Sequence, residues 1–270
     1  MLNRVLKIYL GLLLLGSLLY ANENTPANWW QKGSYEYNAT NEVLTHVEGM
    51  FRYSKTDGND KNKDLSATLS AKIRKNHFGA SLSFTKTRES RKMFDDKSST
   101  TPIETEKDEY ELSFVLGYDI SEDFYLNAGY INSRDISFEV YNQTTMYFGV
   151  GYRLLTLDSH RLTIFASKGS EDISFGTYPQ LPSGKTNGYY YQTNYTWMIT
   201  QGVTLDTSYS YLQADMKNRD TSLFTAQLII GVSKHISFLI GYRDEYMAAQ
   251  DTVNRYTNDS TTYTALKFQF

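Results

Sequence analysis

Residues 65–74 read Leu-Ser-Ala-Thr-Leu-Ser-Ala-Lys-Ile-Arg, and this stretch decides the fold class. Apolar residues occupy every odd position, while serine, threonine or a basic residue occupies every even one. Because the side chains of a β-strand point alternately to its two faces, the stretch predicts a strand with one apolar face and one polar face.

The same period of two recurs along the rest of the chain. About twelve segments follow it, starting near Val43, Leu65, Phe78, Tyr110, Phe124, Met146, Leu162, Tyr189, Val203, Phe224, Ile236 and Thr262. Each segment has roughly 10 residues, which is the length that a tilted strand needs to cross a bilayer. The pattern is therefore typical of strands that face lipid on one side.

The connections between these segments alternate in length. Short breaks fall at residues 75–77, 119–123, 154–159, 200–202 and 233–235, and longer polar stretches fall at residues 86–107, 169–186 and 244–259. Outer-membrane barrels have short periplasmic turns and long extracellular loops. We therefore predict an all-β fold, an antiparallel up-and-down transmembrane β-barrel of about twelve strands that occupies residues 42–270.

Composition excludes several other classes. The 270 residues contain no cysteine, which excludes disulfide scaffolds, Cys-ligated metal centres and thiol nucleophiles. A net charge of −3 gives no basic footprint for nucleic acid, so no nucleic-acid partner is expected. The mean hydropathy of −0.49 is too polar for a helical membrane bundle, and 15% aromatic residues are too many for a disordered chain.

The N-terminus predicts a cleaved signal peptide over residues 1–21. Arg4 and Lys7 precede an apolar run at residues 8–19, and Ala21 supplies a small residue before a cut at Asn22. A retained transmembrane anchor is the alternative, but the run is short for a bilayer span. We expect residues 22–41 to form a periplasmic lead and the mature protein to reach the outer membrane of a Gram-negative cell.

The C-terminus ends in an alternating apolar pattern formed by Leu266, Phe268 and Phe270. It resembles the C-terminal signal that outer-membrane barrels present to their assembly machinery. We therefore predict three kinds of partner, which are outer-membrane lipid, the barrel assembly machinery, and periplasmic chaperones during biogenesis.

Charged residues on the polar faces are predicted to line the lumen. They are Glu48, Arg52, Lys72, Arg74, Glu109, Glu111, Arg153, Arg161, Asp206, Arg243 and Lys267. Seven are basic and four are acidic, and a basic lining favours anions. The alternative is that opposite charges pair with one another and fill a small barrel that conducts nothing.

The alternative fold is a secreted β-sandwich or a lipocalin-like barrel, whose strands also alternate. Residues such as Glu48, Arg52 and Lys72 would then have to face water, because unpaired charges cannot form a dry core. The apolar faces would all have to fill a single interior. Tyrosine and tryptophan near the segment ends are more typical of strands that face lipid between aromatic girdles.

The four histidines give little indication of catalysis. His77, His160 and His235 lie in or beside predicted short turns, and His46 lies on the first predicted strand. Nothing in their spacing sets one of them beside a particular serine, as a hydrolase would need. We therefore predict no enzymatic activity, no cofactor and no metal site.

Three stretches carry a family resemblance: the hairpin at residues 55–59 with the strand at 65–71, residues 151–155 followed by Asp158 and Arg161, and the end at residues 268–270. Together they resemble the salt-induced outer-membrane protein family, a domain of unknown function. The resemblance covers residues 43–270. It implies a bacterial outer-membrane barrel with no catalytic signature and a link to osmotic or salt response.

The sequence therefore favours a small pore or diffusion channel for ions or small solutes, with a mixed and mildly basic lumen. The alternative is a structural or salt-stress barrel that does not conduct. A membrane-embedded hydrolase is the least favoured of the three.

Overall fold

The structure is a computed structural model that describes residues 43–57, 61–93, 103–135, 142–174, 183–215, 220–247 and 258–270. The predicted signal peptide and periplasmic lead lie outside the described residues. Twelve strands follow in chain order: β1 (Leu44–Asp57), β2 (Lys61–Lys75), β3 (Phe78–Met93), β4 (Ile103–Asp119), β5 (Phe124–Asp135), β6 (Asn142–Thr156), β7 (His160–Ser174), β8 (Gly184–Thr200), β9 (Val203–Ala214), β10 (Thr221–Ser233), β11 (Ile236–Met247) and β12 (Asn258–Gln269).

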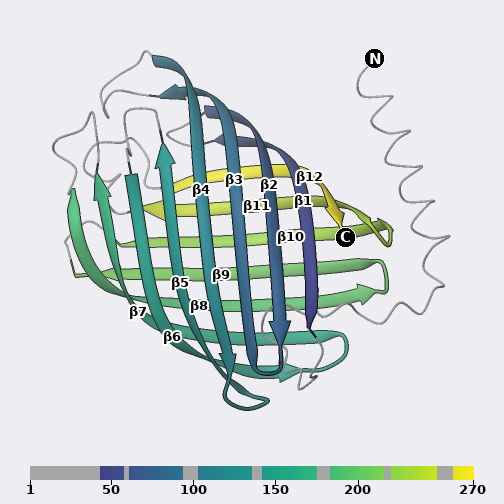
Figure 1. Cartoon of the computed structure of the whole chain (residues 1–270). Coiled ribbons are helices and arrows are strands. Elements are labelled where there is room, and N and C mark those ends of the chain that lie inside the picture. The colour runs from purple at the N-terminus through teal and green to yellow at the C-terminus, as the bar shows by residue number, and fades with distance from the viewer. Residues whose placement is uncertain are drawn as a thin grey trace.

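The twelve strands form one closed antiparallel barrel. Each strand pairs with its neighbour in sequence, and β1 pairs with β12 to close the ring. The front wall, with β1 to β6, runs steeply across Figure 1, while β8 to β12 cross behind it at a large angle. Closure leaves no strand edge with unpaired backbone groups. The prediction of an all-β barrel of about twelve strands is confirmed.

The strands are longer than the sequence pattern indicates, at 12 to 17 residues. The sequence predicts a loop over residues 86–107, whereas β3 continues to Met93 and β4 begins at Ile103. Arg88 stands opposite Asp108 in the register of this hairpin, and opposite charges on cross-strand neighbours stabilise pairing. The charged stretch therefore extends the hairpin beyond the apolar band. The loops predicted over residues 169–186 and 244–259 are also shorter than expected, since strands occupy both ends of each range.

The two ends of the barrel differ in their connections. At one end, which we call the short-turn end, successive strands are joined by residues 76–77, 120–123, 157–159, 201–202 and 234–235. Asn76 adopts a left-handed backbone conformation there (φ 51°), which asparagine tolerates better than most residues. The chain also ends at the short-turn end, where Phe270 and Val47 exchange two backbone hydrogen bonds of 2.8 and 3.1 Å. The other end is called the long-loop end.

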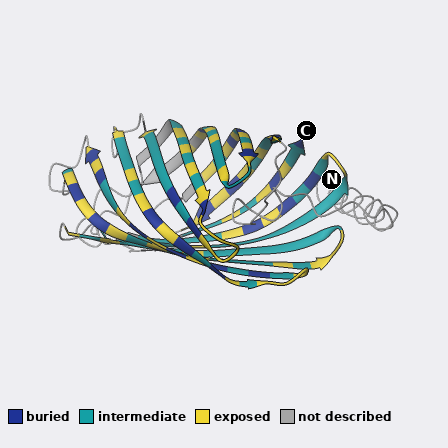
Figure 2. Cartoon of the chain, turned by 60° about the horizontal axis from the view of Figure 1, so that its bottom comes forward, coloured by how far each residue is buried: buried dark blue, intermediate teal, exposed yellow. Residues whose placement is uncertain are grey.

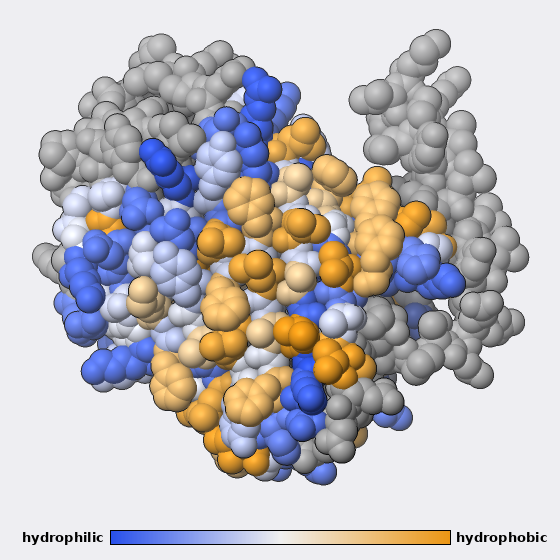
Figure 3. Space-filling model, viewed as in Figure 1, coloured by the Kyte–Doolittle hydropathy of each residue, from blue (hydrophilic) through white to orange (hydrophobic). Residues whose placement is uncertain are grey.

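The outer wall of the barrel is apolar across its middle. Figure 2 shows exposed positions alternating with buried or intermediate ones along the strands. Large apolar side chains occupy the exposed positions, for example Phe51 (58% exposed), Leu65 (62%) and Phe148 (60%). Figure 3 shows a hydrophobic patch across the middle of the face in view, with hydrophilic side chains toward the long-loop end. An apolar surface of this extent is suited to lipid and not to water.

Among the described residues, no helix has the length and apolar character required for a membrane span.

Candidate functional site: the barrel interior

The inner surface carries the charged residues selected from the sequence. Arg74, Arg153 and Arg161 are buried, with 5%, 3% and 8% of their surfaces exposed. Glu111 is exposed, and the seven other selected residues are intermediate in burial: Glu48, Arg52, Lys72, Glu109, Asp206, Arg243 and Lys267. All eleven alternate along their strands with outward-facing residues. Their part in passing a solute is still a prediction.

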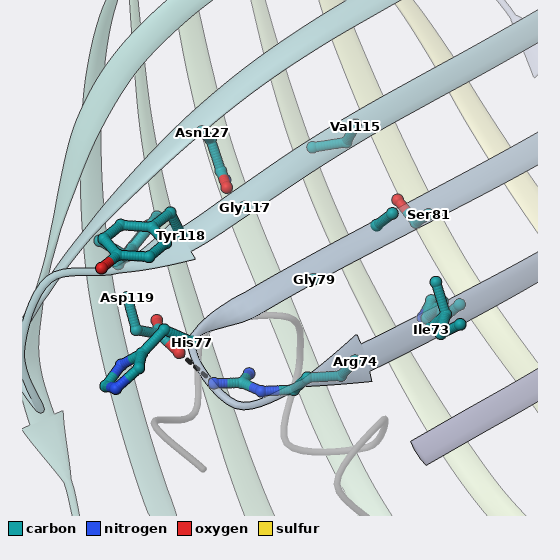
Figure 4. Close-up of a pocket in the computed structure, with 13 residues that line it drawn as sticks. Ile73, Arg74, His77, Gly79, Ser81, Val115, Gly117, Tyr118, Asp119 and Asn127 are labelled. Carbon is teal, nitrogen blue, oxygen red and sulfur yellow. Dashed lines mark hydrogen bonds and ion pairs between the residues drawn. The ribbon is translucent and has the colours of Figure 1, made fainter. Parts of the chain in front are cut away.

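One charged cluster at the short-turn end joins three strands. Asp119, the last residue of β4, forms ion pairs with Arg74 of β2 and with Arg153 of β6. In Figure 4 the guanidinium of Arg74 points at the carboxylate of Asp119. Arg153 also donates hydrogen bonds to the backbone carbonyls of Ser121 (3.2 Å) and Glu122 (2.8 Å). Two buried arginines therefore share one carboxylate, and the second of them also anchors the turn between β4 and β5.

A second cluster, in which two basic side chains again share one carboxylate, lies on β12, β1 and β2. The Nζ atom of Lys267 lies 2.7 Å from the Oε2 atom of Glu48, and the Nε2 atom of His46 lies 3.2 Å from the same oxygen. Lys72 also attracts this carboxylate, although at longer range. Two lysines therefore share one glutamate, as two arginines share Asp119.

The two clusters are continuous along the inner wall. Lys72 and Arg74 are two residues apart on β2 and face the same side, which puts their Cα atoms about 7 Å apart in an extended strand. Arg161, the second residue of β7, stands opposite Thr156 of β6 at the same end of the barrel. We call the set Lys267, Glu48, Lys72, Arg74, Asp119, Arg153 and Arg161 the basic arc.

The basic arc borders a cavity of about 430 Å³ inside the barrel. Four basic side chains line the cavity, namely Lys72, Arg153, Arg161 and Lys267, against the two acidic side chains of Glu48 and Asp206. The wall formed by β8 to β11 contributes mainly hydroxyl and amide groups: Asn194, Thr196, Thr204, Thr207, Ser208, Thr225, Gln227 and Ser237. The cavity is thus basic on one side and hydroxyl-rich on the other, and Met50, Leu155, Ile229 and Leu239 add apolar surface to it.

Aromatic rings occupy another part of the interior. Tyr125 stacks on Phe165 at 6.2 Å between ring centroids, and Tyr147 meets Phe165 edge-on at 6.0 Å. Tyr190 lies within 6.4 Å of both Phe165 and Tyr147. These four residues, called the aromatic cluster, come from β5 to β8 and fill space beside the polar cavity.

Toward the long-loop end the inner wall is more acidic. Arg243 forms an ion pair with Glu245 at 2.8 Å, and its charge also interacts with Glu109 and Glu111. Arg52 donates a hydrogen bond to Ser66 at 3.2 Å and lies over the ring of Tyr263 at 5.5 Å. Two arginines thus face several carboxylates in this half of the barrel.

Among the side chains that the structure describes, four inward-facing acids were missed in the sequence count of seven basic and four acidic residues: Asp64, Asp119, Glu171 and Glu245. Each continues the inward-facing alternation of its strand toward a strand end, so carrying the period of two through to the turns would have found them. The interior is therefore not basic throughout. For the described side chains, the basic excess is confined to the short-turn half.

The three residues of the proposed assembly signal lie on β12 and at the chain end. Leu266 and Phe270 are exposed on the outer wall, at 42% and 78%. The ring of Phe268 meets that of Phe51 edge-on at 6.4 Å. Recognition of these residues by the assembly machinery stays a prediction.

Two histidines have structural partners at the short-turn end. The Nδ1 atom of His160 lies 2.8 Å from the hydroxyl of Tyr195, and that of His235 lies 3.0 Å from the carbonyl oxygen of Gln269. Among the described ranges, no cluster of three or more His, Asp or Glu side chains could hold a metal ion. Both histidines thus contact a residue of a neighbouring strand.

One known family matches the sequence, and solved structures share its architecture. The family described as "Protein of unknown function, DUF481" matches residues 50–270. Comparison with curated proteins gives no match. Among solved structures, the chain is similar to an outer membrane channel from Pseudomonas putida F1, with a TM-score of 0.54, 12% identity, and coverage of 88% of this chain and 98% of that one. It is also similar to the NanC porin, with a TM-score of 0.53, 10% identity, and coverage of 82% and 98%. At these identities the likeness shows a shared fold.

Proposed function

We propose that this chain, which belongs to the DUF481 family of proteins of unknown function, is an outer-membrane channel for small solutes or ions. The polar cavity of about 430 Å³ within the barrel carries the proposal. A barrel with a purely structural role has no need to leave polar volume inside, because empty space forfeits packing energy. The two structural relatives, which are a porin and a channel by name, agree with this function.

The proposed location follows from the outer wall. Exposed apolar side chains such as Phe51, Leu69 and Phe148 suit the hydrocarbon layer of a bilayer. The short-turn end would then face the periplasm and the long-loop end the cell exterior. Cleavage after Ala21 and recognition of the terminal Phe270 by the assembly machinery complete the proposed route to the membrane.

The proposed selectivity is a mild preference for anions, set in the short-turn half. The basic arc has more cations than carboxylates, and a fixed positive potential inside the barrel raises the local concentration of anions. The acidic long-loop half opposes this effect. We therefore expect weak selectivity instead of exclusion of cations.

Single-channel recording in a planar bilayer tests the proposal. The purified mature protein should give discrete current steps that grow with salt concentration. In a salt gradient, the sign of the reversal potential should indicate a preference for anions. Silence from protein whose circular dichroism shows a folded barrel would overturn the channel function. A reversal potential on the cation side would overturn the selectivity.

A filled barrel that conducts nothing is the second candidate, and the aromatic cluster favours it. Tyr125, Tyr147, Phe165 and Tyr190 occupy interior space that an open channel would leave to water. The link to salt stress implied by the family resemblance belongs with this candidate. It predicts silent bilayers together with raised expression at high salt. We expect no hydrolytic turnover on ester or lipid substrates under either candidate.

A further inference from the structure

The interior cavity has two chemically different walls, which a bare passage for ions does not require. Lys72, Lys267 and the two arginines of β6 and β7 lie on one side. Hydroxyl and amide groups of β8 to β11 lie on the other. Such an arrangement is suited to a ligand that has an anionic group at one end and hydroxyl groups on the rest of its body.

The basic wall can accept a further negative charge. Glu48 is shared between Lys267 at 2.7 Å and Lys72 at longer range. Asp119 is shared between Arg74 and Arg153. Since each carboxylate serves two cations, the arc as a whole stays positive, and the single Asp206 of the facing wall does not balance it. An oxyanion is the group that such a wall stabilises best.

Groups on the facing wall can both donate and accept hydrogen bonds. Hydroxyls donate and accept by rotation, so a wall of threonines and serines adapts to a ligand hydroxyl group. Ser208 and Thr225 already bond to each other at 2.6 Å, and Asn194 donates to Thr163 at 3.4 Å. A serine or threonine hydroxyl has one donor and two acceptor sites, so these groups can form further hydrogen bonds to a ligand hydroxyl.

We infer that this cavity is a binding site for a small hydroxylated oxyanion, such as a hydroxy acid or a phosphorylated polyol. Its volume of about 430 Å³ lies within the usual range of ligand pockets, about 300–1,000 Å³. The oxyanion binds at Lys72 and Lys267, and the hydroxyl groups bind along Thr196, Thr204 and Thr225. The inference deepens the proposed channel function, but binding at this site does not require an open passage.

Equilibrium binding in detergent micelles tests the site without a membrane. Isothermal calorimetry at low salt on the mature protein would use five probes: gluconate, glucose 6-phosphate, glucose, acetate and inorganic phosphate. Gluconate and glucose 6-phosphate should each bind more tightly than glucose, which lacks the anion, and than acetate and phosphate, which lack the hydroxyl groups. Preference between the first two assigns a carboxylate or a phosphate as the favoured oxyanion. Equal affinity for glucose, or no binding of either hydroxylated anion, overturns the inference.

Substitutions then locate the site. Lys72→Gln should weaken gluconate binding about tenfold, since one charge-assisted hydrogen bond is lost, and Lys72→Arg should restore most of the affinity. Arg243→Gln removes an equal charge from the inner wall outside the cavity lining and should leave the affinity unchanged. An equal loss in both Gln variants would show that net charge and not this cavity binds the probe.

The outcomes also separate this inference from the proposed function. If the protein binds gluconate in micelles but gives no current in bilayers, the binding site is supported and the channel function is overturned. If the protein conducts but binds neither hydroxylated anion, the channel function is supported and the binding site is overturned.

Discussion

The ring of Tyr125 lies directly against the backbone of Gly151, its cross-strand partner on β6. Tyr125 is 2% exposed, and its ring also stacks on Phe165. The guanidinium of Arg153 lies over the same ring, 5.0 Å from its centroid. The absence of a side chain at residue 151 makes room for the ring. Tyr147 and Tyr263 lie against Gly129 and Gly241 in the same way. Cross-strand tyrosine and glycine pairs thus join neighbouring strands on the inner wall.

Gly151→Ala should destabilise the barrel, because the new Cβ would overlap the ring of Tyr125. Overpacking of this kind costs about 1–3 kcal/mol. Urea unfolding of the protein in lipid vesicles, followed by tryptophan fluorescence, would measure the loss. Gly79→Ala is the matched control, since its nearest neighbouring atom would lie 3.9 Å away, and it should unfold as the parent does. Equal stability of the two variants would refute the packing role of this pair.

Asp119→Asn should be more costly, because it leaves Arg74 and Arg153 without their shared carboxylate. Breaking a buried ion pair by removing one partner costs about 3–5 kcal/mol. Heating the folded protein in detergent and following its shifted gel migration would report the loss as a lower transition temperature. The control is Asp57→Asn, which breaks the exposed pair with Lys55 at 3.1 Å and should change little. If both variants have the same transition temperature, the cluster has no special part in stability.

Much of the fold follows from the period of two in the sequence. In β2, Leu65 to Ile73 alternate with Ser66 to Arg74, and the structure exposes the first set on the outer wall. Strand ends could not be predicted, since beyond the apolar band both faces are polar and the alternation disappears. For that reason β3 and β4 extend through residues that the sequence pattern assigns to a loop.

The candidate site was predictable only in part. Arg74 and Arg153 are recognisable as inward-facing, but their common partner Asp119 lies at a strand end beside a turn. Residues 74, 119 and 153 are distant in sequence and meet only because β2, β4 and β6 end at the same edge of the barrel. The position of the aromatic cluster likewise depends on strand tilt and register, which the pattern of one strand does not contain.

The basic arc should set the ion preference of the channel. Lys72→Gln combined with Lys267→Gln removes two positive charges from the cavity lining, so the reversal potential in a salt gradient should move toward that of a cation channel. Lys55→Gln combined with Lys86→Gln removes the same charge from exposed positions, where the two side chains are 55% and 48% exposed. That control should have the same reversal potential as the parent protein. Equal shifts in the two double variants would assign the effect to overall charge.

The aromatic cluster should limit the conductance. Tyr147→Ala combined with Phe165→Ala removes two interior rings of β6 and β7 that meet edge-on at 6.0 Å. Because pore current scales with the open cross-section, single-channel current should rise measurably, and a silent parent should acquire steps. Phe148→Ala, which removes an exposed ring from the outer wall of the same strand (60% exposed), should leave the current unchanged. A double variant that folds but conducts no better than the parent would show that the constriction lies elsewhere, with the charged clusters as the next barrier to remove.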